Sequence, residues 1–333
     1  MRWADPLPSF GDAQTPLIIA TKHHSAQGKL LISGEYAVLD GALALALPTK
    51  VGQHLEVFDH YSRQAELYWR SLDHQSQCWF ETRLQLPDLS CLQTSDDQAT
   101  QRLQQLLQSA IRQNPDFAHQ LPGRLVQTRL DFPRLWGLGS SSTLVHLLAQ
   151  WAQVDSYDLL ADTFGGSGYD LACAAAQGPI LYQRINGQPT SKEIDFSPDF
   201  RPHIYFVYLG RKQNSREGIA RYRELGSASD SMIQHITNIT EAMLAADSLR
   251  AFESLIRQHE QLVSGTLALI RAKNLYFDDY WGEVKSLGAW GGDFVLITNN
   301  RSREELKSYL QARDFHTLLS YDELILSRPS STP

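Results

Sequence analysis

Residues 136–145 read Trp-Gly-Leu-Gly-Ser-Ser-Ser-Thr-Leu-Val, a short glycine-serine turn that runs directly into an apolar, helix-like segment. The first N–H groups of a helix have no internal partner, and the helix dipole favours negative charge at that end. Glycine lets an anion approach the main chain, and serine hydroxyls add donors or metal ligands. The turn therefore favours a phosphate-binding loop, with an ordinary serine N-cap as the alternative that these residues alone leave open.

The composition is that of a globular protein with an acidic balance. The chain has 333 residues, enough for two domains, of which 42% are hydrophobic and 20% charged. A net charge of −7 argues against a general nucleic-acid-binding protein, which would carry a basic face. It is compatible with a local basic pocket, so we expect an anionic small-molecule substrate and no nucleic-acid partner.

The cysteines and the apolar runs bear on location. Cys78, Cys91 and Cys173 are widely spaced and form no CxxC pair, which indicates neither a zinc site nor a disulfide framework. This cysteine usage favours a reducing compartment, and we expect a cytoplasmic protein. The first residues do not resemble a signal peptide, and the longest clean apolar run, residues 42–47, is too short to cross a membrane. We therefore expect no membrane association, and either a monomer or a homodimer.

Strand-like and helix-like segments alternate in both halves of the chain, which predicts an α+β fold. Glycine and proline cluster over residues 186–202, and we place a domain boundary there, giving domains 1–195 and 196–333.

Three local patterns predict elements near the two ends of the chain. Residues 42–47 favour a buried strand that ends at Pro48. Ser302 with Glu305 forms the pattern of a capping box that opens a helix. Residues 316–325 are expected to supply a final strand.

Three further segments could carry chemistry. Gly28-Lys29 precedes a short apolar run, residues 166–170 end in an aspartate at the start of a helical run, and residues 285–293 hold three glycines beside a strand. Taken singly, each fits a structural role: a solvated lysine, a helix N-cap and a tight turn. Taken together with the glycine-serine turn, they supply a phosphate cradle, a charge neutraliser and a hydroxyl activator, which phosphoryl transfer requires.

The order of these motifs resembles the GHMP kinase superfamily, which includes galactokinase, homoserine kinase, mevalonate kinase and phosphomevalonate kinase. Residues 28–39 resemble its first motif, residues 137–142 its phosphate loop and residues 285–293 its third motif. The resemblance covers nearly the whole chain. It implies the two-domain α+β fold of these kinases, with a ribosomal protein S5 domain 2-like N-terminal domain and a ferredoxin-like C-terminal domain.

Details within the motifs are similar to one branch of the superfamily. Gly34-Glu35-Tyr36 and the glycine-rich run that ends at Asp170 look like those of phosphomevalonate kinases, where mevalonate kinases usually have a histidine after the glutamate. The segment from Phe164 to Ala174 is similar to a bacterial subgroup of GHMP kinases that is named for its GYDIA signature.

The resemblance implies ATP and Mg²⁺ as cofactors and assigns residues to each part of the site. Asp170 would orient or deprotonate the acceptor, and Lys29 would stabilise both Asp170 and the transferred phosphoryl group. Ser141 aligns with the family serine that reaches Mg²⁺. The expected nucleotide contacts are Gly137, Leu138, Gly139, Ser140, Ser141 and Ser142. The expected acceptor contacts are Glu35, Tyr36, Lys212, Ser215, Arg216 and Gly291.

The implied activity is ATP-dependent transfer of the γ-phosphoryl group to a hydroxyl or phosphate acceptor. The branch favours phosphomevalonate or mevalonate, in isoprenoid precursor synthesis. One departure supports an alternative: Trp290 stands where the third motif normally has glycine, and its indole would narrow the phosphate site or shift the loop. A catalytically inactive ligand sensor or regulator is therefore one alternative, and a GHMP kinase for another small metabolite is a second.

Overall fold

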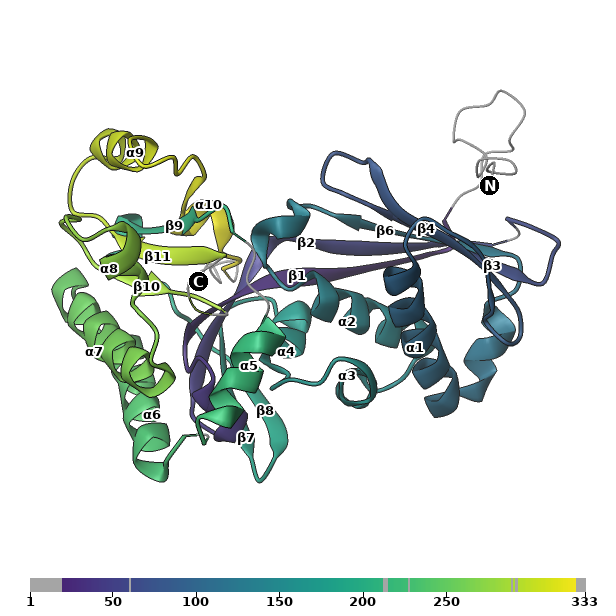
Figure 1. Cartoon of the computed structure of the whole chain (residues 1–333), viewed down its shortest axis with the longest axis horizontal. Helices are drawn as coiled ribbons and strands as arrows, with labels where there is room; N and C mark the ends of the chain where they lie inside the picture. Colours follow the sequence, from purple (N-terminus) through teal and green to yellow (C-terminus); the bar gives the residue numbers. More distant parts are fainter. Residues whose placement is uncertain are drawn as a thin grey trace, which may run out of the picture.

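The computed structural model describes residues 20–59, 61–211, 215–226, 228–288, 290 and 293–327, without the side chains of residues 215 and 216. Figure 1 shows two packed parts, with the N-terminal sheet and its helices at the right and the C-terminal sheet and its helices at the left. The long strands β1 (Lys22–Ser33) and β2 (Ala44–Phe58) run from the first part toward the second.

The N-terminal part is built on a sheet that has eight strands within the described residues. The order is β5-β4-β3-β6-β2-β7-β8, with β1 paired to β2. All of its pairs are antiparallel except β3 with β6. The remaining strands are β3 (Glu66–Leu72), β4 (Cys78–Gln85), β5 (Cys91–Thr94), β6 (Arg124–Leu130), β7 (Ile180–Ile185) and β8 (Gln188–Glu193).

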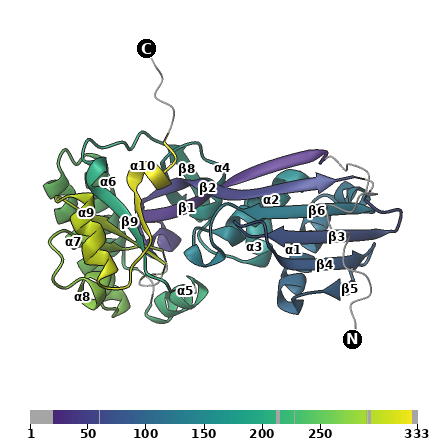
Figure 2. The ribbon, with the colours of Figure 1, turned by 90° about the horizontal axis from the view of Figure 1, so that it is seen from above.

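Helices cover one face of this sheet, as the two views in Figures 1 and 2 show. Apolar residues at helical spacing face the sheet, so that Leu103 and Leu107 pack in one core with Trp69 and Trp151. This core holds the helix that follows the glycine-serine turn firmly in place. The helices are α1 (Asp97–Gln113), α2 (Ser140–Ala152), α3 (Ser156–Thr163) and α4 (Tyr169–Ala175).

The expected end of a strand at Pro48 is wrong, because β2 continues through Pro48 to Phe58. Proline has no N–H to give to the ladder, and it lies opposite Lys29, beside a register shift in β1 between Gln27 and Lys29. At this irregularity the Lys29 N–H donates instead to the carbonyl of Leu138, at 3.0 Å. The proline is thus tolerated where β1 bonds to the glycine-serine turn.

The C-terminal part is a sheet of order β10-β11-β9-β12 with helices on both faces. Alternate side chains of β9 and β11 point to opposite faces: Phe206 and Leu296 pack with α6 and α7, and Val207 and Val295 pack with α8 and α9. The strands are β9 (Ile204–Tyr208), β10 (Val284–Ser286), β11 (Phe294–Thr298) and β12 (Leu318–Ser320). The helices are α5 (Ser215–Glu224), α6 (Asp230–Leu244), α7 (Leu249–Leu267), α8 (Ala272–Tyr276), α9 (Arg303–Gln311) and α10 (Tyr321–Leu324).

Two expectations for this part have different outcomes. The capping box of Ser302 and Glu305 is confirmed at the start of α9. The single strand expected over residues 316–325 is wrong, since β12 ends at Ser320 and α10 follows directly. Ser320 and Glu323 form a second capping box, which favours a helix over continued extension.

One hydrophobic core joins the two parts. Leu30 and Ile32 of β1 pack in the same cluster as Phe206 of β9 and Phe252 of α7. The boundary that the sequence suggests, between residues 195 and 196, falls between the last strand of the first sheet and the first strand of the second. The shared core fixes the parts against each other at the ends of β1 and β2.

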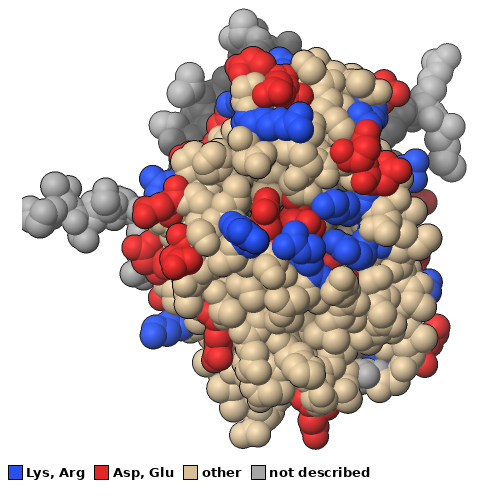
Figure 3. Space-filling view, turned by 90° about the vertical axis from the view of Figure 1, so that its left-hand side faces the viewer, with Lys and Arg blue, Asp and Glu red and all other residues tan. Residues whose placement is uncertain are grey.

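The surface of the C-terminal part mixes both signs of charge. Figure 3 shows this face, where α7 and α8 lie, with basic side chains gathered around acidic ones near its middle. Glu283, just before β10, pairs with cations from two helices, Arg257 at 2.6 Å and Lys273 at 3.1 Å. Along the described chain, no helix is both long and apolar enough to cross a membrane. Cys78, Cys91 and Cys173 are free thiols.

Candidate active site

The glycine-serine turn forms a helix N-terminus without a side-chain cap. Gly137 and Gly139 have φ values of 66° and 91°, in the left-handed region that favours glycine, and α2 begins at Ser140. Gly139 occupies the N-cap position, and no side chain caps the helix there. The alternative of an ordinary serine N-cap is therefore wrong. The first N–H groups of α2 suit an anion.

Close packing also requires glycine at both positions. A Cβ atom on Gly137 would lie 2.1 Å from a carboxylate oxygen of Asp293, and one on Gly139 would lie 3.1 Å from Cγ of Lys29. The turn is thus held between Lys29 of β1 and Asp293, which directly precedes β11. Asp293 belongs to the C-terminal part, so both parts of the molecule build this site.

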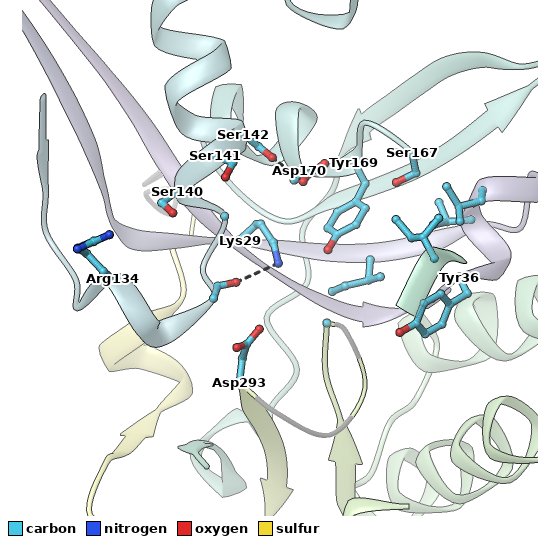
Figure 4. A pocket seen from close by; sticks show the side chains of 17 residues that line it. Lys29, Tyr36, Arg134, Ser140, Ser141, Ser142, Ser167, Tyr169, Asp170 and Asp293 are labelled. Atoms are coloured by element: carbon cyan, nitrogen blue, oxygen red, sulfur yellow. Dashed lines mark hydrogen bonds between the residues drawn. The ribbon is translucent and has the colours of Figure 1, made fainter. Parts of the chain in front are cut away.

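Lys29 lies in the middle of the site with its ammonium group directed at the turn (Figure 4). Its Nζ donates to the carbonyl of Gly137 at 3.2 Å and lies 5.7 Å from the centre of the Tyr169 ring. A cation is thereby held beside the loop that would receive phosphate groups.

Asp170 reaches the same site from the first turn of α4. Its carboxylate accepts a hydrogen bond from Ser142 Oγ at 2.5 Å, which Figure 4 marks with a dashed line. Lys29 and Asp170 line the same cavity, as expected, but no ion pair among the described residues joins them. The lysine ammonium donates to the carbonyl of Gly137, and a serine of the glycine-serine turn donates to the aspartate.

Two cavities meet at the glycine-serine turn. The first measures about 200 Å³ and contains both Lys29 and Asp170. The second measures about 640 Å³ and extends between the sheet and α1. Both are lined by Ser140, Ser141 and Arg134, so a single elongated ligand could occupy the two. The remaining polar lining of the first cavity comprises Tyr36, Ser142, Ser167, Tyr169 and Asp293.

The end of the first cavity away from the turn is largely apolar. Leu31, Val38, Leu39 and Ile219 form its walls, and Tyr36 adds a phenol. Tyr36 has a φ of 61°, which is strained for a tyrosine. Burial raises its pKa to about 12, so the hydroxyl stays neutral near pH 7.

The sequence predicts that Glu35 contacts the acceptor, but the structure has its side chain outside the cavity. Glu35 is 1% exposed and does not line the cavity. Its carboxylate accepts a hydrogen bond from Lys285 of β10, and its other oxygen lies 3.1 Å from Nε2 of His259. A buried carboxylate needs a cation such as Lys285, and this pair holds Glu35 toward the C-terminal part and away from the cavity.

The other predicted acceptor residues lie in or beside segments outside the described residues. Lys212 and Gly291 fall there entirely. Ser215 and Arg216 begin α5, but their side chains are also outside the description. Trp290 is described: it is 4% exposed and packs with Tyr36 and Tyr222. It does not line the first cavity, so the indole does not narrow the phosphate site as expected.

The residues present fit a magnesium ion bound together with phosphate groups. The hydroxyl of Ser141 and the carboxylates of Asp170 and Asp293 line one cavity, and oxygen atoms are the ligands that Mg²⁺ prefers. No group of three or more histidine, cysteine or acidic side chains among the described residues could hold a metal ion by itself. The ion would therefore need phosphate oxygens and water to complete its coordination.

Sequence reasoning missed two charged residues of this site, Arg134 and Asp293. Each lies close to a glycine-rich turn in the sequence, Arg134 three residues before Gly137 and Asp293 directly after Gly292. That adjacency was the available signal, because side chains that flank a phosphate loop reach the same space as the loop.

Comparison with known proteins adds the fold relationship. No family model matches the chain, and no curated protein matches it either. Among solved structures, L. major mevalonate kinase in complex with R-mevalonate is 16% identical, with a TM-score of 0.64 over 96% of this chain and 99% of that one. Streptococcus pneumoniae phosphomevalonate kinase in complex with phosphomevalonate and AMPPNP is also 16% identical, with a TM-score of 0.66 over 90% and 99%.

A sugar kinase is similar as well. Lactococcus lactis galactokinase in complex with galactose is 10% identical, with a TM-score of 0.63 over 93% of this chain and 95% of that one. The chain therefore has the two-domain α+β fold of the GHMP kinases. At these identities the similarity establishes the fold, and the activity has to be argued from the site.

Proposed function

We propose that the protein is an ATP-dependent kinase that transfers the γ-phosphoryl group of ATP to a small molecule, with mevalonate or phosphomevalonate as the acceptor. One observation carries the proposal: two cavities meet at an uncapped helix N-terminus, and one of them also contains Lys29 and Asp170. A helix N-terminus that would bind an anion, a cation and a carboxylate lie around one point, which supports phosphoryl transfer.

The nucleotide would occupy both cavities. The larger one has apolar and aromatic walls, among them Leu103, Leu106 and Phe164, which suit a nucleobase. The triphosphate would then cross Ser140 and Ser141, where the first N–H groups of α2 provide donors. This direction leaves the γ-phosphoryl group in the smaller cavity, beside Lys29.

Ser141, with Asp170 or Asp293, would hold Mg²⁺ against the phosphate groups. When bound, the ion neutralises charge on the transferred phosphoryl group.

Asp170 and Lys29 have distinct roles in this proposal. Asp170 would accept the proton of an acceptor hydroxyl on the carboxylate oxygen that does not receive the hydrogen bond from Ser142. The acceptor oxygen forms a bond to the γ-phosphorus as the bond to the ADP oxygen breaks, so ADP leaves with the electron pair. Lys29 would move little, since Gly137 already holds its ammonium group beside the transferred phosphoryl.

The acceptor would lie at the apolar end, between Tyr36 and Tyr169. Leu31, Val38 and Ile219 suit an aliphatic portion of the substrate, such as the methyl-bearing carbon chain of mevalonate. A carboxylate or phosphate on the acceptor would need further cations. We propose that Lys212 and Arg216, which precede Ile219 in the chain, supply them.

The test is phosphorylation of a panel of acceptors. Purified protein with ATP and Mg²⁺ should form ADP and a phosphorylated product with mevalonate or 5-phosphomevalonate, detected by a coupled assay and mass spectrometry. Asp170→Asn and Lys29→Met should each remain folded and lose turnover by roughly 10²-fold or more. Wild-type turnover in both variants would refute the roles of these residues, and AMPPNP binding without any product across the panel would favour the ligand sensor.

A further inference from the structure

Arg134 is the charged side chain that lines both cavities. It begins the short 3₁₀ turn Arg134–Trp136, which directly precedes Gly137. Ser140 and Ser141 also line both cavities. In Figure 4 it lies on the same side of the turn as Ser140, whereas Lys29 lies on the other side. A ligand that extends from one cavity into the other would have to pass beside its guanidinium group.

Trp79 of β4 fixes the plane of that guanidinium group. The central carbon of the group lies 3.6 Å from the centre of the indole ring, a stacked cation–π contact. Trp79 itself lines the larger cavity. Stacking uses the face of the guanidinium and leaves the N–H groups in its plane, which is the edge that binds phosphate in a bidentate manner.

Arg134 also differs from neighbouring arginines in its partners. Arg124 and Arg129 of β6 each pair with an aspartate, at 2.5 Å and 2.8 Å. Among the described residues, by contrast, no ion pair includes Arg134, and its close contact is the neutral indole of Trp79. Asp96 and Asp73 attract its charge without forming an ion pair with it, so the N–H groups of the guanidinium are not held by a carboxylate where the cavities meet.

We propose that Arg134, oriented by Trp79, binds phosphate oxygens of the nucleotide where the ligand passes from the larger cavity onto the glycine-serine turn. This inference rests on the proposed function. It assigns to Arg134 the phosphate groups nearer the nucleoside and leaves the γ-phosphoryl group to Lys29. Two cations would then hold the triphosphate from opposite sides of the Gly137–Ser142 turn. The bound triphosphate would thereby extend from the larger cavity, where the nucleobase lies, toward Asp170.

The experiment measures binding of three probes to the full chain by calorimetry: AMPPNP with Mg²⁺, inorganic tripolyphosphate and adenosine. Arg134→Ala should weaken AMPPNP and tripolyphosphate by about 10-fold or more, because a charge-assisted contact is lost. Adenosine should bind as it does to the wild type. Arg134→Lys keeps the charge and loses the planar fork, and Trp79→Leu removes the stack, so each should fall between the wild type and Arg134→Ala.

Arg301 provides a matched control, because its guanidinium stacks on Trp281 at 4.2 Å in the C-terminal part and lines neither cavity. Arg301→Ala should leave the affinity for AMPPNP within about 2-fold of the wild type. Arg134 is exposed, and unchanged melting temperatures would show that its variants fold.

The possible failures are distinguishable. If the wild type binds AMPPNP and Arg134→Ala binds it equally well, the assignment of Arg134 is wrong and the proposed function stands. If the wild type binds neither AMPPNP nor tripolyphosphate, both proposals are wrong. If Arg134→Ala weakens AMPPNP but the wild type phosphorylates no acceptor, Arg134 is a nucleotide-binding residue of a protein that is not a kinase.

Discussion

Lys285 Nζ donates a hydrogen bond to the carboxylate of Glu35, 250 residues away in the sequence, and both side chains are fully buried. Glu35 belongs to the turn after β1 and Lys285 to β10, so the pair crosses the interface between the two parts of the molecule. Glu260 of α7 lies 3.8 Å from the same ammonium group. One lysine therefore lies close to two buried carboxylates at the interface between the two parts.

Removing one member of this pair should destabilise the protein strongly. Glu35→Gln and Lys285→Met should each lower the free energy of unfolding by about 3–5 kcal/mol, because a buried charge is left without its partner. Lys285→Met should be the more severe, since it deprives both Glu35 and Glu260 of a cation. Urea-induced unfolding followed by circular dichroism measures the change.

The double variant supplies the decisive comparison. Glu35→Gln combined with Lys285→Met removes both opposite charges. The double variant should therefore lose clearly less free energy of unfolding than the sum of the losses in the two single variants. Arg313 and Asp279 form an exposed pair at 2.5 Å, and Asp279→Asn should lower the free energy of unfolding far less than either buried substitution, because solvent screens an exposed pair. Additive losses in the double variant would show that the buried pair has no special coupling.

Glu260 should make stability depend on pH near neutrality. Burial raises its pKa to about 7 from the usual 4.5, although Lys285 lowers it. A raised folded-state pKa means that the folded protein keeps a proton that the unfolded chain has lost, so stability falls as pH rises from about 4.5 through 7. Lys285 holds the pKa of Glu35 at about 2, and the contribution of that residue is constant above pH 5.

We therefore expect the wild type to lose about 2 kcal/mol of stability at this site between pH 5.5 and 8. Glu260→Gln keeps an acceptor for Ser286, whose N–H and hydroxyl each lie 3.1 Å from the carboxylate, and has no proton to lose. Unfolding of both proteins at the two pH values measures the difference. Identical pH dependence in the variant and the wild type would contradict the assignment.

The sequence could predict the glycine-serine turn, Lys29 and Asp170 as one candidate site because each depends on a local pattern, and the structure has all three in one cavity. A glycine-serine turn before an apolar helix brings its own geometry, and two short motifs supply the remaining groups. The partner of Glu35 could not be predicted in this way. Nothing near Glu35 indicates that its charge is neutralised by Lys285 from the C-terminal part.

Two other errors have different physical origins. Proline lacks an N–H and therefore predicts a strand end at Pro48, but the irregular register of β1 next to it makes that donor unnecessary. The helix α10 was missed although Ser320 and Glu323 show the same capping pattern as Ser302 and Glu305. That signal was present in the sequence and was outweighed by the strand-like residues before it.

Ser142 should influence the chemical step more than nucleotide binding. Its hydroxyl orients Asp170, so Ser142→Ala should lower kcat by about 10-fold and leave the KM for ATP within about 2-fold of the wild type. Ser140 lines both cavities and has no such contact with Asp170; Ser140→Ala should instead raise the KM for ATP. Steady-state kinetics with the preferred acceptor separates the two effects, and equal changes in both variants would refute the separate roles.

Gly137 tests the packing that joins the two parts at the active site. In Gly137→Ala the new methyl group would meet the carboxylate of Asp293, and the φ of 66° would add a strain of about 1 kcal/mol. We expect a lower melting temperature and a KM for ATP raised by about 10-fold, because the turn must shift away from Asp293.

The combination of Gly137→Ala with Asp293→Ala separates the two causes of that loss. Shortening Asp293 removes the atoms that collide with the methyl group, so the double variant should regain part of the melting temperature that Gly137→Ala loses. The backbone strain at residue 137 remains, and recovery should therefore be incomplete. If Asp293→Ala lowers the melting temperature of Gly137→Ala by as much as it lowers that of the wild type, the collision with Asp293 is not what constrains this glycine.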